Sequence, residues 1–313
     1  MKMIPLGGGA LTVSRLAYGC WRLAGTWDPK QVTPEREERG VAAVLAAYEA
    51  GYTLFDLADI YCQGACESIL GRALREVAGL REHLVIADKC GICPAGSPEP
   101  NSPYRYDFSK AHLIASCEAS LRRLGVETID LYQLHRPDYL CDPAEVAAAF
   151  TELKQSGKVR EVGVSNFKPS QVTMLQRACP MRLVVNQVEI SLAHLTPFED
   201  GTLDHCLAER MTPLAWSPLG GGRLAAAKVD MLDPSHARKM LLQDALDALG
   251  RELGVGRAPV ALAWLLQHPS GIIPIIGSTT PERIQEAAHT PEVALTREQW
   301  YRLFEAARGQ RLP

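Results

Sequence analysis

The stretch TLFDLADIYCQGACESILGRALREVAGLREHLVIADKC, residues 53–90, contains a complete strand–helix–strand unit. Apolar runs at residues 53–57 and 84–87 predict two short strands, and the apolar spacing of residues 66–77 predicts a helix between them. Two successive strands that are separated by a helix pair in parallel, because a parallel pair needs a crossover connection. The unit therefore predicts part of a parallel α/β sheet.

The same alternation continues along the chain. Candidate strands lie at residues 16–19, 53–57, 84–87, 129–134, 159–164, 183–187, 213–216 and 272–276. Each is followed by a candidate helix, at residues 34–50, 66–77, 109–124, 143–155, 169–177, 201–210, 258–267 and 281–288. Several of these helices begin at proline, which is tolerated in the first turn because the missing N–H has no partner there.

Eight strand–helix repeats are the number that closes a barrel. The alternative, an open doubly wound sheet, binds a dinucleotide at a Gly-x-Gly-x-x-Gly turn. The glycine triplets at residues 7–9 and 220–222 both lack the third glycine at the required offset. We therefore expect an (α/β)8 TIM barrel that forms a single domain over residues 1–313. Residues 3–6 and 10–13 predict an N-terminal β-hairpin, and residues 235–253 and 297–308 predict two extra helices.

Composition argues against several classes of protein. The 313 residues carry 33 Lys and Arg against 36 Asp and Glu, and no stretch collects five like charges, so we expect no nucleic-acid partner. No apolar run approaches 18 residues, so we expect no membrane span. Nine cysteines are too few for a disulfide scaffold, and no signal-peptide core is evident. We expect reduced thiols and a cytoplasmic location.

Four side chains with complementary chemistry follow neighbouring predicted strands: Asp56, Tyr61, Lys89 and His135. Active-site residues of such barrels come from the carboxyl ends of several strands. A hydride that reaches a carbonyl carbon leaves negative charge on the oxygen, which then needs a proton. A tyrosine whose pKa is lowered by a lysine can supply it, an aspartate holds the lysine charged, and a neutral histidine can donate to the same oxygen.

Amide and aromatic side chains occupy the next strand ends. Asn166 and Gln187 each offer a donor and an acceptor, which suits the carboxamide of a nicotinamide ring. Trp216 offers a flat face on which such a ring can stack. For Asn186 we favour a structural role in capping or in the core.

Several motifs occur together in one order: FDLADIY at 55–61, Glu67 with LGRAL at 70–74, Lys89, DLYQLH at 130–135, GVSNF at 163–167, NQVE at 186–189 and WSPL at 216–219. Over about residues 10–290 this set resembles the aldo-keto reductase family. The segments GCWRL at 19–23 and AWSPLGGGRL at 215–224 most closely resemble a bacterial subgroup of poorly characterised aldo-keto reductase-like oxidoreductases.

The resemblance implies a barrel with an N-terminal hairpin at its base, and NADPH bound in an extended form without a Rossmann fold. It implies a reductase of aldehydes or ketones in which Tyr61 is the general acid, Lys89 and Asp56 tune it, and His135 orients the carbonyl. Asp88 stands where the family often has a small hydroxyl residue, so we expect its charge to compete with Asp56 for the lysine.

The resemblance also implies the cofactor-binding residues. Ser165, Asn166 and Gln187 would hold the carboxamide, and Trp216 would stack on the ring. The remaining candidates are Gly19 and Trp21, then Ser217, Pro218, Leu219 and Gly220 along the pyrophosphate, and Gly277, Ser278, Thr279, Arg283 and Glu286 at the adenosine end. Candidates for the pocket of a small carbonyl substrate are Trp27, Tyr104 and Arg136. We expect a monomer or a weak homo-oligomer.

Alternatives remain at this stage. Cys62, Cys66, Cys90 and Cys93 have spacings that could bracket Zn²⁺, but we expect no metal, because the lysine and tyrosine already fill the catalytic roles. The same barrel could be an NADPH-binding regulatory or sensor subunit with little turnover. A metal-dependent hydrolase would need several histidines at strand ends, where only His135 lies.

Overall fold

The computed structural model describes residues 1–225 and 236–313. Within these ranges a closed barrel of parallel strands forms, as expected, and β12 pairs with β3 through Ile275 and Ala17 to complete it. In chain order the barrel strands are β3 (Ala17–Gly19), β4 (Leu54–Asp56), β5 (Val85–Cys90), β8 (Ile129–Leu134), β9 (Val159–Ser165), β10 (Leu183–Glu189), β11 (Thr212–Trp216) and β12 (Ile273–Ile276). The (α/β)8 prediction is confirmed.

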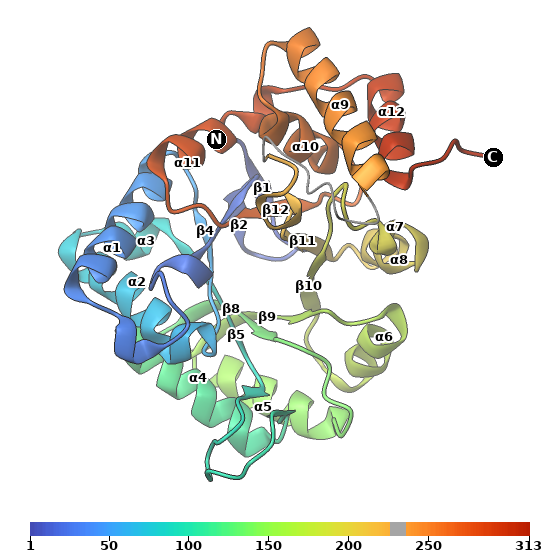
Figure 1. The fold of residues 1–313 in the computed structure, drawn as a ribbon. Coiled ribbons are helices and arrows are strands. Elements are labelled where there is room, and N and C mark those ends of the chain that lie inside the picture. The colour runs from blue at the N-terminus through green and yellow to red at the C-terminus, as the bar shows by residue number, and fades with distance from the viewer. Residues whose placement is uncertain (226–235) are drawn as a thin grey trace.

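Helices surround the barrel (Figure 1). They are α1 (Pro34–Glu49), α2 (Ala65–Glu76), α4 (Lys110–Leu124), α5 (Pro143–Gln155), α6 (Pro169–Ala178), α8 (Thr202–Ala208), α10 (Arg257–Leu266) and α11 (Pro281–Ala288), with the short α3 (Leu80–His83) and α7 (Thr196–Glu199). The two extra helices are confirmed as α9 (His236–Leu253) and α12 (Arg297–Arg308), which pack against each other. No helix in the described ranges is long and apolar enough to span a membrane.

The N-terminal hairpin is confirmed as β1 (Met3–Pro5) and β2 (Thr12–Ser14), which pair antiparallel. Its connecting turn approaches the barrel so closely that only glycine fits: a Cβ at Gly7, where φ is +57°, would lie 2.1 Å from the carbonyl oxygen of Val184. The amide of Gly7 donates to the Thr212 hydroxyl oxygen at 2.7 Å. Apolar side chains of the hairpin share one cluster with the strands and close the amino end of the barrel.

A second hairpin was not expected from the sequence. β6 (Ile92–Cys93) pairs antiparallel with β7 (Arg105–Tyr106) in the connection between β5 and α4. Strands of two residues show no alternation of apolar and polar side chains, and the Pro-, Gly- and Ser-rich stretch between them is typical of a loop. This hairpin carries aromatic residues close to the carboxyl end of the barrel.

Candidate active site

The four predicted catalytic residues lie together at the carboxyl end of the barrel. Asp56 ends β4, Lys89 is in β5, and His135 directly follows β8. The Lys89 ammonium is fully buried and lies 2.6 Å from Asp56 Oδ1. It also lies 5.1 Å from the centroid of the Tyr61 ring, and that ring meets the His135 ring edge-on at 5.8 Å. Parallel strands placed side by side bring these residues together from distant parts of the sequence.

Burial and neighbouring charges act in opposite directions on the pKa values of Lys89 and Tyr61. Burial acts to lower the pKa of Lys89, but the charges of Asp56 and Tyr61 outweigh it and raise that pKa. Burial raises the pKa of Tyr61 to about 12, while the Lys89 charge and hydrogen bond act to lower it. The expected effect of lysine on tyrosine is therefore present, but burial is larger, and Tyr61 retains its proton.

His135 is held as a neutral imidazole. Burial, and then the charges of Lys89 and Arg136, lower its pKa well below the ordinary value. Its Nδ1 is buried and has no hydrogen-bond partner within the described ranges. Its amide donates to the carbonyl oxygen of Cys90 at 2.9 Å, which fixes the backbone at the end of β8. A neutral histidine in this position can donate one hydrogen bond without adding charge to the site.

Gln187 has a role that sequence reasoning did not anticipate. Its Nε2 donates to Asp56 Oδ1 at 2.6 Å, so the aspartate accepts from both Gln187 and Lys89. The Ser165 hydroxyl donates to the Gln187 carbonyl oxygen at 2.9 Å. Gln187 thus orients the ion pair of Asp56 and Lys89, in addition to its predicted contact with a carboxamide.

Asn166 links three strand ends. It adopts a left-handed backbone conformation with φ of +64°, and its Nδ2 donates to Ser165 Oγ at 2.8 Å and to the His135 carbonyl oxygen at 3.1 Å. Its Oδ1 accepts from Trp216 Nε1 at 2.9 Å. The Arg136 guanidinium lies 5.6 Å from the Trp216 ring centroid. Asn166 and Arg136 thus both contact Trp216, the predicted stacking residue, and orient its ring. Asn186, in contrast, exchanges hydrogen bonds with the backbone of Phe167, as a structural residue would.

The predicted pyrophosphate path follows β11. Ser217 has a positive φ of +49°, and the Gly220 amide donates to its carbonyl oxygen at 2.8 Å, which forms a tight turn. Pro218 and Leu219 lie within this turn, and Leu219 packs against both neighbouring apolar clusters. At Gly220, φ is +58° and an added Cβ would lie 3.1 Å from the Ala193 Cβ, so the backbone here is closely packed.

The predicted adenosine end lies at the start of α11. Arg283 is exposed in the first turn and has no ion-pair partner within 4 Å among the described residues. The Thr280 side chain makes no capping hydrogen bond, and Ser278 Oγ accepts from the Thr280 amide at 3.2 Å. The connection from β12 to this helix contains Gly277, Ser278 and Thr279. Glu286 lies on the exposed side of the helix.

Aromatic residues lie in the connections that follow β3 and β5. The Trp21 and Trp27 rings lie 5.6 Å apart, and a Cβ at Gly277 would meet Trp21 Nε1 at 2.8 Å. Gly19 is packed just as closely, since its Cβ would lie 2.9 Å from Ile275 Cγ2. Of the predicted pocket residues, Trp27 and Tyr104 are 59% and 56% exposed, and Arg136 lies against the Trp216 ring.

The four cysteines near the site do not assemble a ligand set. Cys62, Cys66, Cys90 and Cys93 are all buried, and all are free thiols. Within the described part of the chain, the only grouping of three or more metal-ligating side chains is Cys93 with Asp107 and His112. It contains one of the four cysteines.

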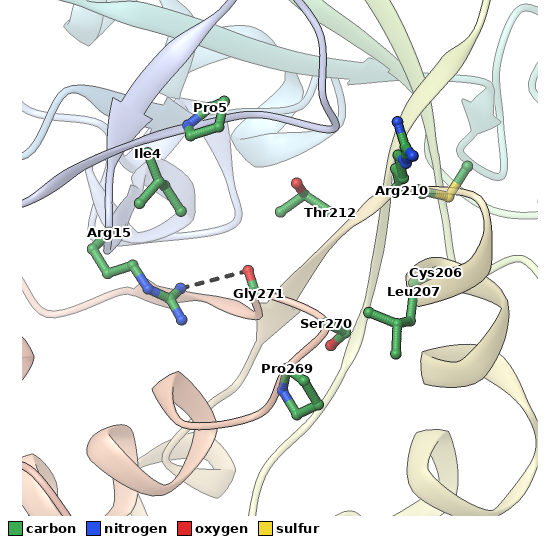
Figure 2. Close-up of a pocket in the computed structure, with 11 residues that line it drawn as sticks. Ile4, Pro5, Arg15, Cys206, Leu207, Arg210, Thr212, Pro269, Ser270 and Gly271 are labelled. Carbon is green, nitrogen blue, oxygen red and sulfur yellow. Dashed lines mark hydrogen bonds between the residues drawn. The ribbon is translucent and has the colours of Figure 1, made fainter.

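Two cavities lie away from the predicted catalytic residues. One of about 320 Å³ lies at the amino end of the barrel, between the hairpin and the starts of β11 and β12 (Figure 2). Arg15 lines it, but its guanidinium donates to the carbonyl oxygens of Leu266, Gly271 and Ile272. Another of about 410 Å³ lies between α6 and α8. None of the four predicted catalytic residues lines either cavity.

The partners of the buried acids behind the site differ from, or were absent from, the sequence prediction. Asp88 was expected to compete with Asp56 for the lysine, but the Lys89 ammonium pairs with Asp56, and Asp88 accepts from the Lys89 backbone amide at 2.9 Å. Glu67 is fully buried and accepts two hydrogen bonds from Arg123, at 2.6 and 3.1 Å. The position of Glu67 within the motif was visible in the sequence, but its partner on α4 was not.

These features define an oxidoreductase, and the chain belongs to the aldo/keto reductase family, whose model matches residues 15–308. It is 42% identical to a 6-dehydroglucose reductase of Novosphingobium aromaticivorans, over 98% of this chain and 96% of that protein. It is 41% identical to the oxidoreductase YdhF of Escherichia coli, over 96% of this chain and 95% of that protein. Members of this family generally use nicotinamide cofactors.

Solved structures agree with this assignment. The glycerol dehydrogenase AKR11B4 from Gluconobacter oxydans is 28% identical, with a TM-score of 0.87 over 98% of this chain and 95% of that chain. The holo form of the aldo-keto reductase AKR11C1 from Bacillus halodurans is 25% identical, with a TM-score of 0.83 over 98% of this chain and 96% of that chain.

Proposed function

We propose that this chain, as a single barrel domain, reduces aldehydes or ketones to alcohols with NADPH, and that Tyr61 is the proton donor. The observation that carries the proposal is the fully buried Lys89, 2.6 Å from Asp56 and in contact with a protonated Tyr61. Structural ion pairs also occur in barrels, but a partly buried tyrosine beside a buried cation at the carboxyl ends of the strands matches the needs of carbonyl reduction.

Each residue has one task in this mechanism. A bound nicotinamide cofactor supplies the hydride. The Tyr61 hydroxyl gives its proton to the carbonyl oxygen, and the Lys89 charge stabilises the phenolate that remains. Asp56 holds Lys89 in place, with help from Gln187. The neutral His135 donates a hydrogen bond to the carbonyl oxygen and so orients the substrate.

The residues at the adenosine end suit a phosphate group. The first turn of α11 presents backbone N–H groups and the positive end of the helix dipole, and its Thr280 cap makes no side-chain hydrogen bond. Arg283 adds a guanidinium without an ion-pair partner in the described ranges. A planar guanidinium binds a phosphate through two hydrogen bonds, which favours NADPH over NADH.

The substrate is best sought among hydroxylated aldehydes. Two relatives, at 42% and 40% identity, are named 6-dehydroglucose reductases. The connections after the barrel strands carry the exposed aromatic side chains of Trp27 and Tyr104 and the charged Arg136. Flat aromatic faces pack on the apolar C–H surface of a sugar, while polar groups bind its hydroxyls.

The decisive experiment measures oxidation of NADPH in the presence of a panel of carbonyl compounds, including a sugar aldehyde and a simple reactive aldehyde. Steady turnover supports the proposal. Tight NADPH binding without turnover of any panel member would instead support a regulatory or sensor subunit. We further propose that no metal takes part. Stoichiometric zinc in the purified protein, together with loss of turnover in EDTA, would contradict that.

A further inference from the structure

The interior behind the catalytic lysine holds more acids than cations. Lys89 is paired with Asp56, and Arg123 is paired with Glu67. Asp59 and Asp88 lie in the same interior, and neither forms an ion pair within the described ranges. A buried carboxylate without a cation is strongly disfavoured, because it loses its hydration without compensation. One way to avoid that penalty is to keep a proton.

Asp88 is the acid whose geometry requires the proton. It is fully buried, its Oδ1 accepts from the Lys89 amide, and its Oδ2 has no donor among the described residues. Glu67 is the charged group with the largest effect on the pKa of Asp88, and a hydrogen bond between two carboxyl groups needs one proton. Because Glu67 already accepts two bonds from Arg123, the unpaired Asp88 carboxyl group is the better site for that proton. Burial, followed by the charges of Glu67 and Asp59, raises the pKa of Asp88 well above its ordinary value.

We propose that Asp88 is a protonated positioning residue, whose carboxyl group donates to Glu67 and thereby connects the strand that carries Lys89 to the helix that follows Tyr61. Glu67 lies in the first turn of α2, and Arg123 lies near the end of α4. The connection rests on the proposed roles of Tyr61 and Lys89. Asp88 itself does not contact the reacting atoms.

The segment between Tyr61 and α2 needs such support. Three consecutive residues, Cys62, Gln63 and Gly64, adopt positive φ angles of 46°, 51° and 89°. Left-handed conformations of non-glycine residues persist only where the surroundings enforce them. The Arg123 side chain fills the space beside Gly64, where an added Cβ would lie 2.5 Å from Arg123 Cδ. The backbone next to the proton donor is therefore fixed by successive contacts that involve Asp88, Glu67, Arg123 and Gly64.

Other ionisable groups face Asp88 from the surrounding elements. They are Lys89, Cys90, Cys20, Asp59, Tyr61, Glu67, Arg123 and, from α4, Cys117. Burial raises the pKa of the three thiols, so they stay neutral. Burial, and then the Glu67 charge, raises the pKa of Asp59 to about 7. Measurements above pH 7 therefore separate Asp88 from Asp59.

The protonation state is tested by unfolding, without any turnover. Native Asp88 keeps a proton that the unfolded chain releases near pH 4, so each pH unit above that favours unfolding, by up to about tenfold in the unfolding equilibrium constant. Asp88→Asn removes this dependence. We expect the unfolding free energy of the wild-type protein, measured with denaturant from pH 7 to 9, to fall with pH more steeply than that of Asp88→Asn, with Asp59→Asn keeping the wild-type slope. Equal slopes for wild type and Asp88→Asn would overturn the proposal.

The positioning role is tested by kinetics at pH 7. An asparagine can still donate to Glu67 and accept from the Lys89 amide, whereas an alanine cannot. We expect Asp88→Ala to lower kcat about 10- to 100-fold with little change in KM, the usual consequence of a misplaced catalytic group. Asp88→Asn should restore most of that loss. An unchanged kcat in Asp88→Ala contradicts the positioning role. Absence of turnover in the wild-type protein contradicts the proposed function and leaves the unfolding result standing.

Discussion

The two ends of the barrel differ in whether their buried polar groups have hydrogen-bond partners. At the amino end, Ser14 and Thr53 exchange hydrogen bonds between amides and hydroxyls at 2.8 and 2.9 Å. The Thr212 hydroxyl oxygen accepts from the Gly7 amide, and Arg15 donates to three backbone carbonyls. At the carboxyl end, buried side-chain atoms lack partners within the described ranges in Asp59, Asp88, Gln133 and His135, and the one other such residue in these ranges is Thr290, just after α11.

The backbone shows the same contrast. Four of the non-glycine residues with positive φ, namely Cys62, Gln63, Asn166 and Ser217, follow strands at the carboxyl end, while Arg210 precedes β11 at the amino end. Unpaired groups and left-handed backbone both destabilise a fold. Their concentration at one end indicates that the hairpin end stabilises the barrel, whereas the end with the candidate active site keeps groups available for ligands and protons.

The largest effect that we expect comes from removal of one hydroxyl at the carboxyl end. Tyr61→Phe should lower kcat by about 10²–10⁴-fold, the usual contribution of a positioned proton donor, while NADPH binding persists. The matched control is Tyr132→Phe, which deletes a buried hydroxyl that donates to the Leu113 carbonyl oxygen at 3.3 Å outside the site. Steady-state kinetics should show a loss only for Tyr61→Phe. A near wild-type kcat in that variant would refute the assignment.

The amino end should respond in stability and not in catalysis. Gly7→Ala places a methyl group against the Val184 carbonyl at a residue with positive φ, and should destabilise the protein by about 2–4 kcal/mol through overpacking and backbone strain. Gly79→Ala has a similar φ of +79° but open space around it, so it should lose only about 1 kcal/mol. Denaturant unfolding measures both, and equal losses would show that the hairpin contact is not tight.

The next effect concerns the phosphate of the cofactor. Arg283→Ala should weaken NADPH binding by about 10- to 150-fold, since a hydrogen bond to a charged group contributes roughly 1.5–3 kcal/mol. NADH, which lacks the 2′-phosphate, should bind with little change. Arg302→Ala, which removes the same charge from α12 and from an exposed pair with Glu252, is the control. Fluorescence titration with both cofactors decides, and an equal loss for NADH and NADPH would mean that Arg283 does not contact the phosphate.

Much of the barrel could be predicted because local patterns determine it. The bounds of β8, α5 and α11 match the sequence prediction, since proline or an apolar run marks their ends. The proximity of the candidate catalytic residues was predictable for a related reason: parallel strands bring their carboxyl ends together wherever they lie in the chain. In these cases a local pattern and a general topological rule were sufficient.

The remaining features depend on long-range contacts that a local pattern does not encode. The amide of Gln187 reaches Asp56, which is 131 residues away in the sequence, and Arg123 reaches Glu67 across 56 residues. Asp88 and Lys89 are adjacent in β5, so their side chains point to opposite faces of the strand, and the Lys89 ammonium pairs with Asp56 and not with Asp88. Sequence alone showed an acidic residue beside Lys89, but the face to which its side chain points depended on the register of the barrel.

The smallest effect compares one histidine from each end. Burial lowers the pKa of His135 well below 6.5, and burial lowers the pKa of His268, at the amino end, whose Nδ1 lies 2.8 Å from the Ser270 hydroxyl oxygen. Below pH 6.5 the unfolded chain binds protons that these native imidazoles do not, so stability falls as the pH drops.

His135 should account for about 1–2 kcal/mol of the loss between pH 6.5 and 5, because one group contributes at most about 1.4 kcal/mol per pH unit. His135→Gln should therefore flatten the dependence of unfolding free energy on pH more than His268→Gln does. Denaturant unfolding of the three proteins at several pH values over this range measures the slopes. A larger change in His268→Gln would mean that the histidine with the more strongly lowered pKa lies at the amino end. That result would contradict the contrast between the two ends.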